Sequence, residues 1–330
     1  MILTSWFRAV IVLVLASGLD YWLGDPWGWP HPVQGMGWFI ATTSKPALTH
    51  DWPQGLKRAW GVGLALTLIL ASGLVGWAVV QIARGLHPML GLGVEAVLLA
   101  SCLAGRSLRR AAEDVLTPLE VGDIETARQH LRYYVGRDTE HLDRPEILRA
   151  VMETVTENAT DGVLAPLFYG LIGFCIPSLG GVPLALAYKA ASTLDSMIGY
   201  RELPYTYLGW FSARLEDGLT WLPCRLAVLT IALLSGHPGQ VWAICCRDAP
   251  ADPSPNAGWS ECAYAAALGV QLGGMNFYRG VAKPKPLLGQ ALYPISSDRI
   301  RRALALTRQA ALIWLGLGLT VIVMIGVGSG

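Results

Sequence analysis

The 330-residue sequence has few charged residues and almost no net charge. Only 15% of its residues are Asp, Glu, Lys or Arg, the formal net charge is +1, and hydrophobic residues make up 53%. A net charge this small argues against nucleic acid or another strongly anionic partner. Together with a mean hydropathy of +0.42, the low charge and the hydrophobic excess are typical of an integral membrane protein.

The sequence also lacks the common signatures of metal and nucleotide binding. Its six cysteines show no C-x-x-C spacing and mostly stand among apolar neighbours, which predicts buried small side chains and argues against a zinc site or a disulfide framework. It contains no Walker A motif, no kinase-type glycine-rich loop and no βαβ alternation. A nucleotide would therefore have to bind at an unfamiliar helical site.

Long apolar segments predict membrane-spanning helices. Segments 59–83 and 310–328 are long enough to cross the hydrocarbon core. The N-terminal segment 6–23 ends in bulky aromatic residues and has no small-residue cleavage site, so we interpret it as a span and not as a secretory signal. Segment 86–105 carries Glu95 in its middle, so either this carboxylate faces the bundle interior or the segment does not fully span.

The remaining segments predict a more irregular bundle. Segments 163–188 and 219–235 contain prolines and, in places, glycines or a charge, and we expect bent, re-entrant or amphipathic helices there. An arginine-rich segment, 106–160, is predicted to form a helical insert on the cytoplasmic side. The predicted fold is an all-α, polytopic membrane helical bundle with broken or re-entrant helices and this insert, with residues 1–330 forming a single integral membrane domain. The number of crossings between 160 and 278 stays open.

One predicted helix of the insert places several acids together. It is expected to begin after Asp143, and along it Glu153, Glu157 and Asp161 recur at i, i+4 and i+8, with Asn158 beside them. These acids could be a solvated helix end, as runs of charge usually are. Alternatively, they could form a site for a divalent cation or phosphate, because Mg²⁺ needs only one or two carboxylates when it also binds substrate phosphates.

Polar motifs along nearly the whole chain, taken together and in order, resemble the CobD/CbiB family, the adenosylcobinamide-phosphate synthases of cobalamin biosynthesis. The motifs are "GDPWGWPHPV" (24–33), "GRDTEHLD" (136–143), "ETVTENATDGVLAPLFY" (153–169), "YKAASTLDSMIGY" (188–200), "GWFSARLEDGLTWLPCRL" (209–226) and "RDAPADPSPNAGWSE" (247–261). Two positions depart from the family pattern: Ser192, where the family usually has Asn, and Glu216, where it usually has Asp. Ser192 replaces the amide of an asparagine by a shorter side chain whose hydroxyl has one donor, where the amide has two.

The resemblance implies an ATP-dependent ligase in the inner membrane that joins adenosylcobyric acid to (R)-1-aminopropan-2-ol O-phosphate, or a related phosphorylated amino alcohol, through an amide bond. Its active site would be cytoplasmic. A carboxylate must first be activated, most simply as an acyl phosphate, so the site needs Mg²⁺, cations for the phosphates and a base for the amine. The corrinoid substrate brings its own cobalt. Other partners would be the lipid bilayer and possible cobamide-pathway enzymes, with no nucleic acid.

The polar motifs supply candidates for each of these roles. The catalytic candidates are Glu157, Asp161, Lys189, Asp195 and His31, and the candidate metal ligands are Glu157, Asp161 and Asp195. The candidates for binding substrate or phosphate are Arg137, Asp138, Asn158, Ser196, Tyr200, Arg214, Arg247, Ser254, Asn256 and Glu261. His31, Glu153 and Glu261 are the candidate bases.

Structural roles and other functions remain as alternatives. Lys189 could belong to an ion-pair network, and a lone histidine such as His31 is more often structural than catalytic. A membrane transporter of corrinoid intermediates would account for Glu95 and the broken segments. A non-catalytic membrane scaffold for pathway enzymes would account for the arginine-rich insert.

Overall fold

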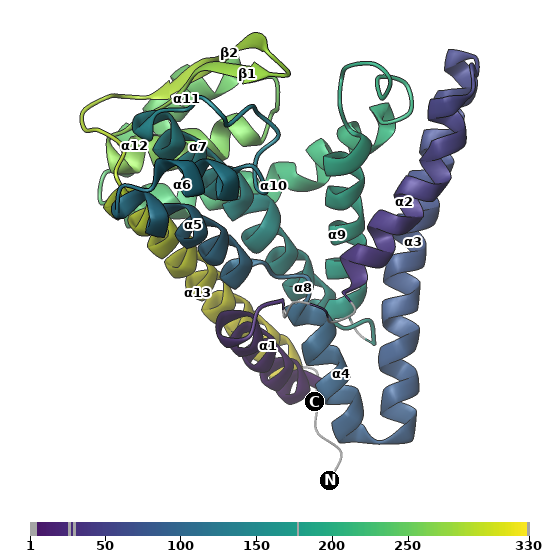
Figure 1. The fold of residues 1–330 in the computed structure, drawn as a ribbon. Helices are drawn as coiled ribbons and strands as arrows, with labels where there is room; N and C mark the ends of the chain where they lie inside the picture. Colours follow the sequence, from purple (N-terminus) through teal and green to yellow (C-terminus); the bar gives the residue numbers. More distant parts are fainter. Residues whose placement is uncertain (1–4, 26–27, 29–30, 177, 329–330) are drawn as a thin grey trace. The chain divides into compact units, whose positions relative to one another are not determined.

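Helices predominate in the computed structural model, which describes residues 5–25, 28, 31–176 and 178–328 (Figure 1). The strands in these residues form one two-stranded antiparallel sheet. Because the structure is mainly helical and its sheet is small, the predicted class of a helical membrane bundle is confirmed. Part of the first polar motif, residues 26, 27, 29 and 30, lies outside the described residues.

The chain divides into two compact units. The first comprises residues 1–104, 165–219 and 313–330, and the second comprises residues 105–164 and 220–312. The predicted insert 106–160 thus falls within the second unit, together with a later part of the chain. Its cytoplasmic location stays a prediction.

The first unit is a bundle of long apolar helices. Its complete helices are α1 (Ser5–Trp22), α2 (Pro32–Thr49), α3 (Gln54–Leu86), α4 (Pro88–Ala100), α8 (Ala165–Cys175) and α9 (Gly181–Ile198). Helix α3 packs against α4 and α9, and α1 packs against α4. The core between them consists of small and branched apolar side chains such as Val12, Ile40, Ala65, Leu99 and Ala185, which allow the helices to approach closely.

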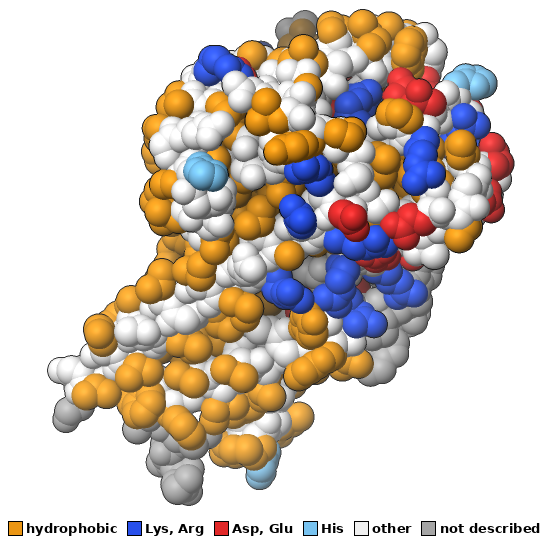
Figure 2. Space-filling model, turned by 90° about the vertical axis from the view of Figure 1, so that its left-hand side faces the viewer, with side chains coloured by type: hydrophobic (Ala, Val, Ile, Leu, Met, Phe, Trp, Pro, Cys, Tyr) orange, Lys and Arg blue, Asp and Glu red, His pale blue; other side chains and the backbone are white. Residues whose placement is uncertain are grey.

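Within the part of the chain that the structure describes, four helices are long and apolar enough to cross a membrane: α1, α3, α10 (Trp210–Leu234) and α13 (Ser297–Gly328). The spans predicted at 6–23, 59–83 and 310–328 lie in α1, α3 and α13. Many of their apolar side chains point outward, for example Leu70, Leu74, Leu317 and Met324. In the lower part of Figure 2, hydrophobic side chains are frequent and Lys, Arg, Asp and Glu are not seen. Such an exposed apolar surface fits contact with lipid.

The predicted broken segments have different outcomes. Segment 163–188 is indeed interrupted, because α8 ends at Cys175 and α9 begins at Gly181. Segment 219–235 is not: α10 is one continuous 25-residue helix with Pro223 inside it, and it qualifies as a span. The bent, re-entrant or amphipathic helix expected there is thus a continuous one, since neighbouring groups in a membrane bundle can compensate for the hydrogen bond that proline removes.

The second unit contains shorter helices and the sheet. Besides parts of α10 and α13, its elements are α5 (Gly105–Glu120), α6 (Ile124–Leu131), α7 (Arg144–Asn158), the π-helix η1 (Ala159–Leu164), α11 (Pro238–Asp248), the 3₁₀ turn η2 (Ala249–Ala251), α12 (Ala257–Leu268), β1 (Gln271–Tyr278) and β2 (Val281–Gly289). The predicted start of α7 is confirmed, since Asp143 and Glu146 form a reciprocal capping box. The hairpin β1–β2 was not predicted. It packs against α7 and α12 and brings residues 271–289 to them.

Candidate functional site

A buried network of charges holds helix α7 to strand β1. The Glu153 side chain is 2% exposed and forms ion pairs with both Arg137 and Arg149, the latter at 3.1 Å between Oε1 and Nη1. Both arginines also donate to Oδ1 of Asn276 on β1, at 2.8 and 3.0 Å. Burial alone would raise the pKa of Glu153, but Arg137, Lys285 and Arg149 together hold it below its usual value. Glu153 is therefore a firmly ionised, fully engaged carboxylate.

Gly273 completes this network through its backbone. Its N–H donates to Oε1 of Glu153 at 3.0 Å, and its φ of +88° lies in the region that favours glycine. A Cβ at this position would lie 1.9 Å from the carbonyl oxygen of Pro286 on the paired strand. The register between the strands shifts between Leu272 and Gly274, as a β-bulge does when it redirects the chain. A glycine is thus required for β1 to reach the Glu153 carboxylate.

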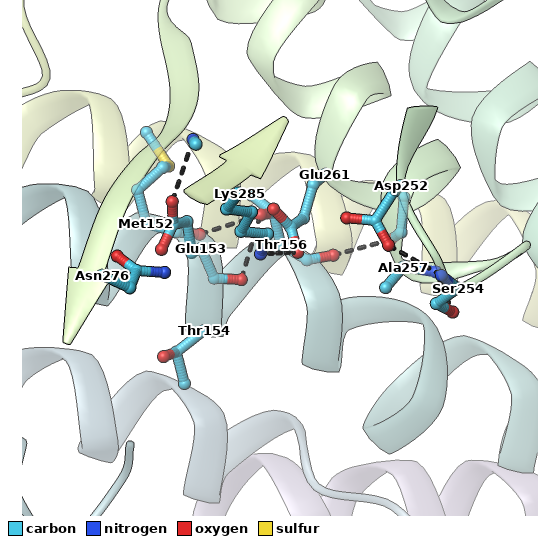
Figure 3. Close-up of polar contacts among 12 residues, drawn as sticks. Met152, Glu153, Thr154, Thr156, Asp252, Ser254, Ala257, Glu261, Asn276 and Lys285 are labelled. Carbon is cyan, nitrogen blue, oxygen red and sulfur yellow. Dashed lines mark hydrogen bonds and ion pairs between the residues drawn. The ribbon is translucent and has the colours of Figure 1, made fainter. Parts of the chain in front are cut away.

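A second acid beside this network is paired with a lysine from β2. Glu261 on α12 is fully buried, and Nζ of Lys285 lies 2.7 Å from its Oε1. Figure 3 shows the two side chains pointing toward each other, between α7 and the segment that carries Asp252 and Ser254. The Oε2 atom of Glu261 is buried and has no hydrogen-bond partner among the described residues. An orphaned carboxylate oxygen of this kind is costly and needs an explanation.

The electrostatics of this pair are strongly perturbed. Burial raises the pKa of Glu261 well above its usual value, and Glu157 and Glu153 raise it further, although Lys285 opposes them. Burial also works against the charge of Lys285, but Glu261, Glu153 and Glu157 together raise its pKa. Lys285 is therefore a permanent cation, unsuited to act as a base.

Glu157 differs from Glu153 and Glu261 because its carboxylate has no partner among the described residues. It lies one helical turn after Glu153 on α7, is partly exposed, and makes no hydrogen bond or ion pair to any residue that the structure describes. Burial raises its pKa, Lys285 lowers it, and Asp252 and Glu153 raise it again. We call Glu153, Glu157, Glu261 and Lys285 the carboxylate cluster. Within it, Glu157 is the group able to meet a ligand, because it is partly exposed and makes no hydrogen bond or ion pair to a described residue.

The other predicted residues of the second unit mostly have structural partners. Arg137 is committed to the Glu153 network, and Asp138 accepts hydrogen bonds from the backbone N–H groups of Arg279 and Gly280 at the hairpin turn. Arg247 pairs with its neighbour Asp248. These contacts leave the predicted substrate roles of Arg137, Asp138 and Arg247 without direct support.

Residues at the ends of α7 and α12 are also engaged locally. Asn158 donates to the carbonyl of Thr154. Asn256 stands directly before α12, but its side chain does not cap the helix. The Ser254 hydroxyl instead accepts from two backbone N–H groups there. Asp161 lies in the π-helix η1, where the α-helical spacing that placed it on the face of Glu153 no longer applies.

The first unit holds the remaining predicted residues, and we describe them within that unit only. His31 caps α2, because its Nδ1 accepts from the N–H of Val33 at 3.2 Å, while its Nε2 lies 3.1 Å from Oδ1 of Asp25. Helix α9 carries Lys189, Asp195 and Ser196, and the Lys189 ammonium has no partner among the described residues. Tyr200 donates to the carbonyl of Ser196, and Arg214 is exposed on α10.

The described residues bring no three His, Cys, Asp or Glu side chains together in a way that could hold a metal ion. A Mg²⁺ that keeps its waters and binds substrate phosphates needs fewer ligands. The predicted metal ligands Glu157, Asp161 and Asp195 therefore stay a prediction.

Sequence reasoning missed Lys285, the residue on which the perturbed acids depend. A usable signal was the alternation "KPKP" at 283–286, because prolines at alternate positions are compatible with an edge strand and place Lys283 and Lys285 on its other face. Asn276 and Arg149 had no comparable signal.

The chain is similar to known proteins over almost its entire length. A family model described as CobD/Cbib protein matches residues 13–307. The chain is 52% identical over 321 residues to "Cobalamin biosynthesis protein CobD" of Synechocystis sp., covering 97% of this chain and 94% of the relative. It is 41% identical over 308 residues to a protein of the same name from Halalkalibacterium halodurans, covering 92% and 93%. It is 40% identical over 312 residues to "Cobalamin biosynthesis protein CbiB" of Salmonella arizonae, covering 93% and 96%. No solved structure matches the chain.

Proposed function

Because the chain belongs to the CobD/CbiB family, we propose that this membrane protein of cobalamin biosynthesis is an acid–amine ligase. It would join adenosylcobyric acid to (R)-1-aminopropan-2-ol O-phosphate, or a related phosphorylated amino alcohol, and form adenosylcobinamide phosphate. ATP would phosphorylate the carboxylate and leave as ADP. The amine would then attack the acyl carbon, inorganic phosphate would leave, and the nitrogen would lose a proton. We further propose that the protein lies in the inner membrane, with its active site on the cytoplasmic side.

The observation that best supports this chemistry is the contrast between Glu157 and Glu153. An amine attacks only when neutral, so the site must accept a proton from the ammonium form. Glu153 is a poor acceptor, because its pKa is lowered and its oxygens are engaged. Glu157 is accessible, has no partner among the described residues, and has a raised pKa. We assign the proton transfer to Glu157.

Lys285 supports this role through its charge. Burial raises the pKa of Glu157, and the nearby Lys285 ammonium opposes that rise. The phosphates of ATP and of the amino alcohol need cations. Lys189 and Arg214 stay candidates on the sequence alone, and each is described within the first unit only. Mg²⁺ would arrive with ATP and neutralise charge on its phosphate oxygens.

Detergent-purified protein supplied with adenosylcobyric acid, Mg²⁺-ATP and the aminopropanol phosphate tests the proposal. Mass spectrometry should detect the amide product and ADP only when all three are present. Glu157→Gln should lower turnover by about 10²-fold or more, the usual contribution of a positioned acid or base. Glu140→Gln, an exposed control, should keep full turnover.

Failure of this assay would separate the alternatives. Substrate movement into liposomes that needs neither ATP nor amine would favour a transporter. Full ligation by Glu157→Gln would remove Glu157 from the mechanism while leaving the reaction in place. If folded, substrate-binding protein gave neither product nor transport, a scaffold role would replace the ligase.

A further inference from the structure

The first unit contains a buried ion cluster that the proposed reaction does not use. Glu95 on α4 is 1% exposed, although it lies in a strongly apolar helix. Oε2 of Glu95 is 2.6 Å from Nη2 of Arg84 on α3 and 3.7 Å from Nε of Arg8 on α1. One carboxylate thus faces two guanidinium groups from two other helices, and the three side chains carry a net charge of +1.

The two arginines have more donors than this carboxylate can accept. Arg8 makes no hydrogen bond to any residue that the structure describes, and the Nε atoms of Arg8 and Arg84 are buried without an acceptor among those residues. Both side chains nevertheless reach the surface, with exposed fractions of 26% and 17%. A guanidinium group has five N–H donors in a planar fork, so unfilled donors at a surface favour an oxyanion that can accept two of them at once.

The position of the cluster indicates where such an oxyanion would come from. Arg8 lies in the first turn of α1 and Arg84 in the last turn of α3, so each arginine stands at the end of a candidate span. Ends of spans lie at the level of the lipid headgroups. Large apolar side chains next to the arginines in the sequence are exposed: Phe7 at 41%, Leu86 at 74% and Met89 at 55%. A phosphate with attached acyl chains matches this combination better than a free phosphate ion does.

We propose that Arg8 and Arg84 bind the phosphate group of an anionic phospholipid, with Glu95 orienting the two guanidinium groups. The exposed apolar side chains beside them contact the acyl chains. Basic sites at the ends of membrane helices bind lipid headgroups in this manner. The bound lipid fills the open donors and neutralises the excess positive charge.

Native mass spectrometry and thermal unfolding of the detergent-purified, full-length protein test this site. The probes are dioctanoyl phosphatidylglycerol, dioctanoyl phosphatidylcholine and inorganic phosphate. We expect phosphatidylglycerol to form adducts and raise the unfolding temperature, whereas the other two probes give little effect. Arg8→Met should weaken phosphatidylglycerol binding about tenfold, in line with the loss of a charge-assisted contact.

A matched arginine at the other end of α3 provides the control. Arg58 lies over the rings of Tyr207 and Trp210, and Arg58→Met should leave phosphatidylglycerol binding unchanged. Should Arg8→Met fail to fold, Leu86→Asp serves instead, because this exposed position can repel an anionic headgroup without disturbing the core. Equal losses in the Arg8 and Arg58 variants, or no loss in the Arg8 and Leu86 variants, would overturn the site. An equal effect of inorganic phosphate would overturn the assignment to a lipid.

Discussion

Replacing Glu153 with glutamine should destabilise the protein far more than its single lost charge suggests. The substitution leaves Arg137, which is buried, and Arg149 facing each other without their shared carboxylate. Removing one partner of a buried ion pair costs about 3–5 kcal/mol, because the remaining charge stays desolvated. The exposed pair of Arg132 and Glu140 offers the contrast, since Glu140→Gln should cost less than about 1 kcal/mol.

Unfolding in detergent, followed by circular dichroism at several pH values, measures both costs. The pKa of Glu153 is lowered in the folded state, so its contribution is present above the unfolded value of about 4.3 and is lost as the pH falls through the folded value. The difference between wild type and Glu153→Gln should therefore shrink on acidification. If Glu153→Gln were as stable as Glu140→Gln at neutral pH, the network would not be the support that its geometry indicates.

Three further predictions concern catalysis, the hairpin and the α2 cap. Glu157 must be ionised to accept a proton, so turnover should fall as the pH drops through its raised pKa. Lys285 is a cation that lowers this pKa. In Lys285→Met the pKa of Glu157 should therefore rise further, and the acidic limb of the pH–rate profile should move to higher pH. If the acidic limb stayed at the same pH, Glu157 would not be the group whose ionisation controls turnover. Gly273→Ala should lower the unfolding temperature more than Gly280→Ala, because both positions have positive φ but only Gly273 lacks room for a Cβ. His31→Ala should lower the free energy of unfolding by about 1 kcal/mol, because the cap of α2 is lost, whereas His31→Asn should keep the cap and the stability. If His31→Asn is stable but loses turnover, the imidazole ring of His31 takes part in catalysis.

Sequence predicted best the features that depend on near neighbours. The spans of α1, α3 and α13 follow from apolar length alone. The start of α7 follows from the spacing of Asp143 and Glu146, which meet within one helical turn whatever surrounds them. Continuity through Pro223 could not be predicted in this way, because its cost depends on neighbouring groups that sequence does not place.

The contacts of the candidate site depend instead on distant segments. The Gly273 N–H reaches Glu153 across 120 residues, and this requires a hairpin whose strands are rich in glycine and proline. Such residues are unfavourable in strands, so composition argued against the sheet that carries Lys285. The spacing of acids was visible in the sequence, but the cations that distinguish one acid from another were not.

Glu153 and Glu157 show how much this distinction matters. They are four residues apart on one helix, and sequence spacing alone gave them equivalent positions. Packing against the hairpin gives Glu153 two arginines and a backbone N–H, which fix it as an anion. One turn later, Glu157 makes no hydrogen bond or ion pair to a described residue, and burial raises its pKa, whereas the pKa of Glu153 is lowered. Two like groups whose environments separate their pKa values are the arrangement from which acid–base roles are assigned. The hairpin, which composition did not reveal, is therefore what separates a structural glutamate from one available for chemistry.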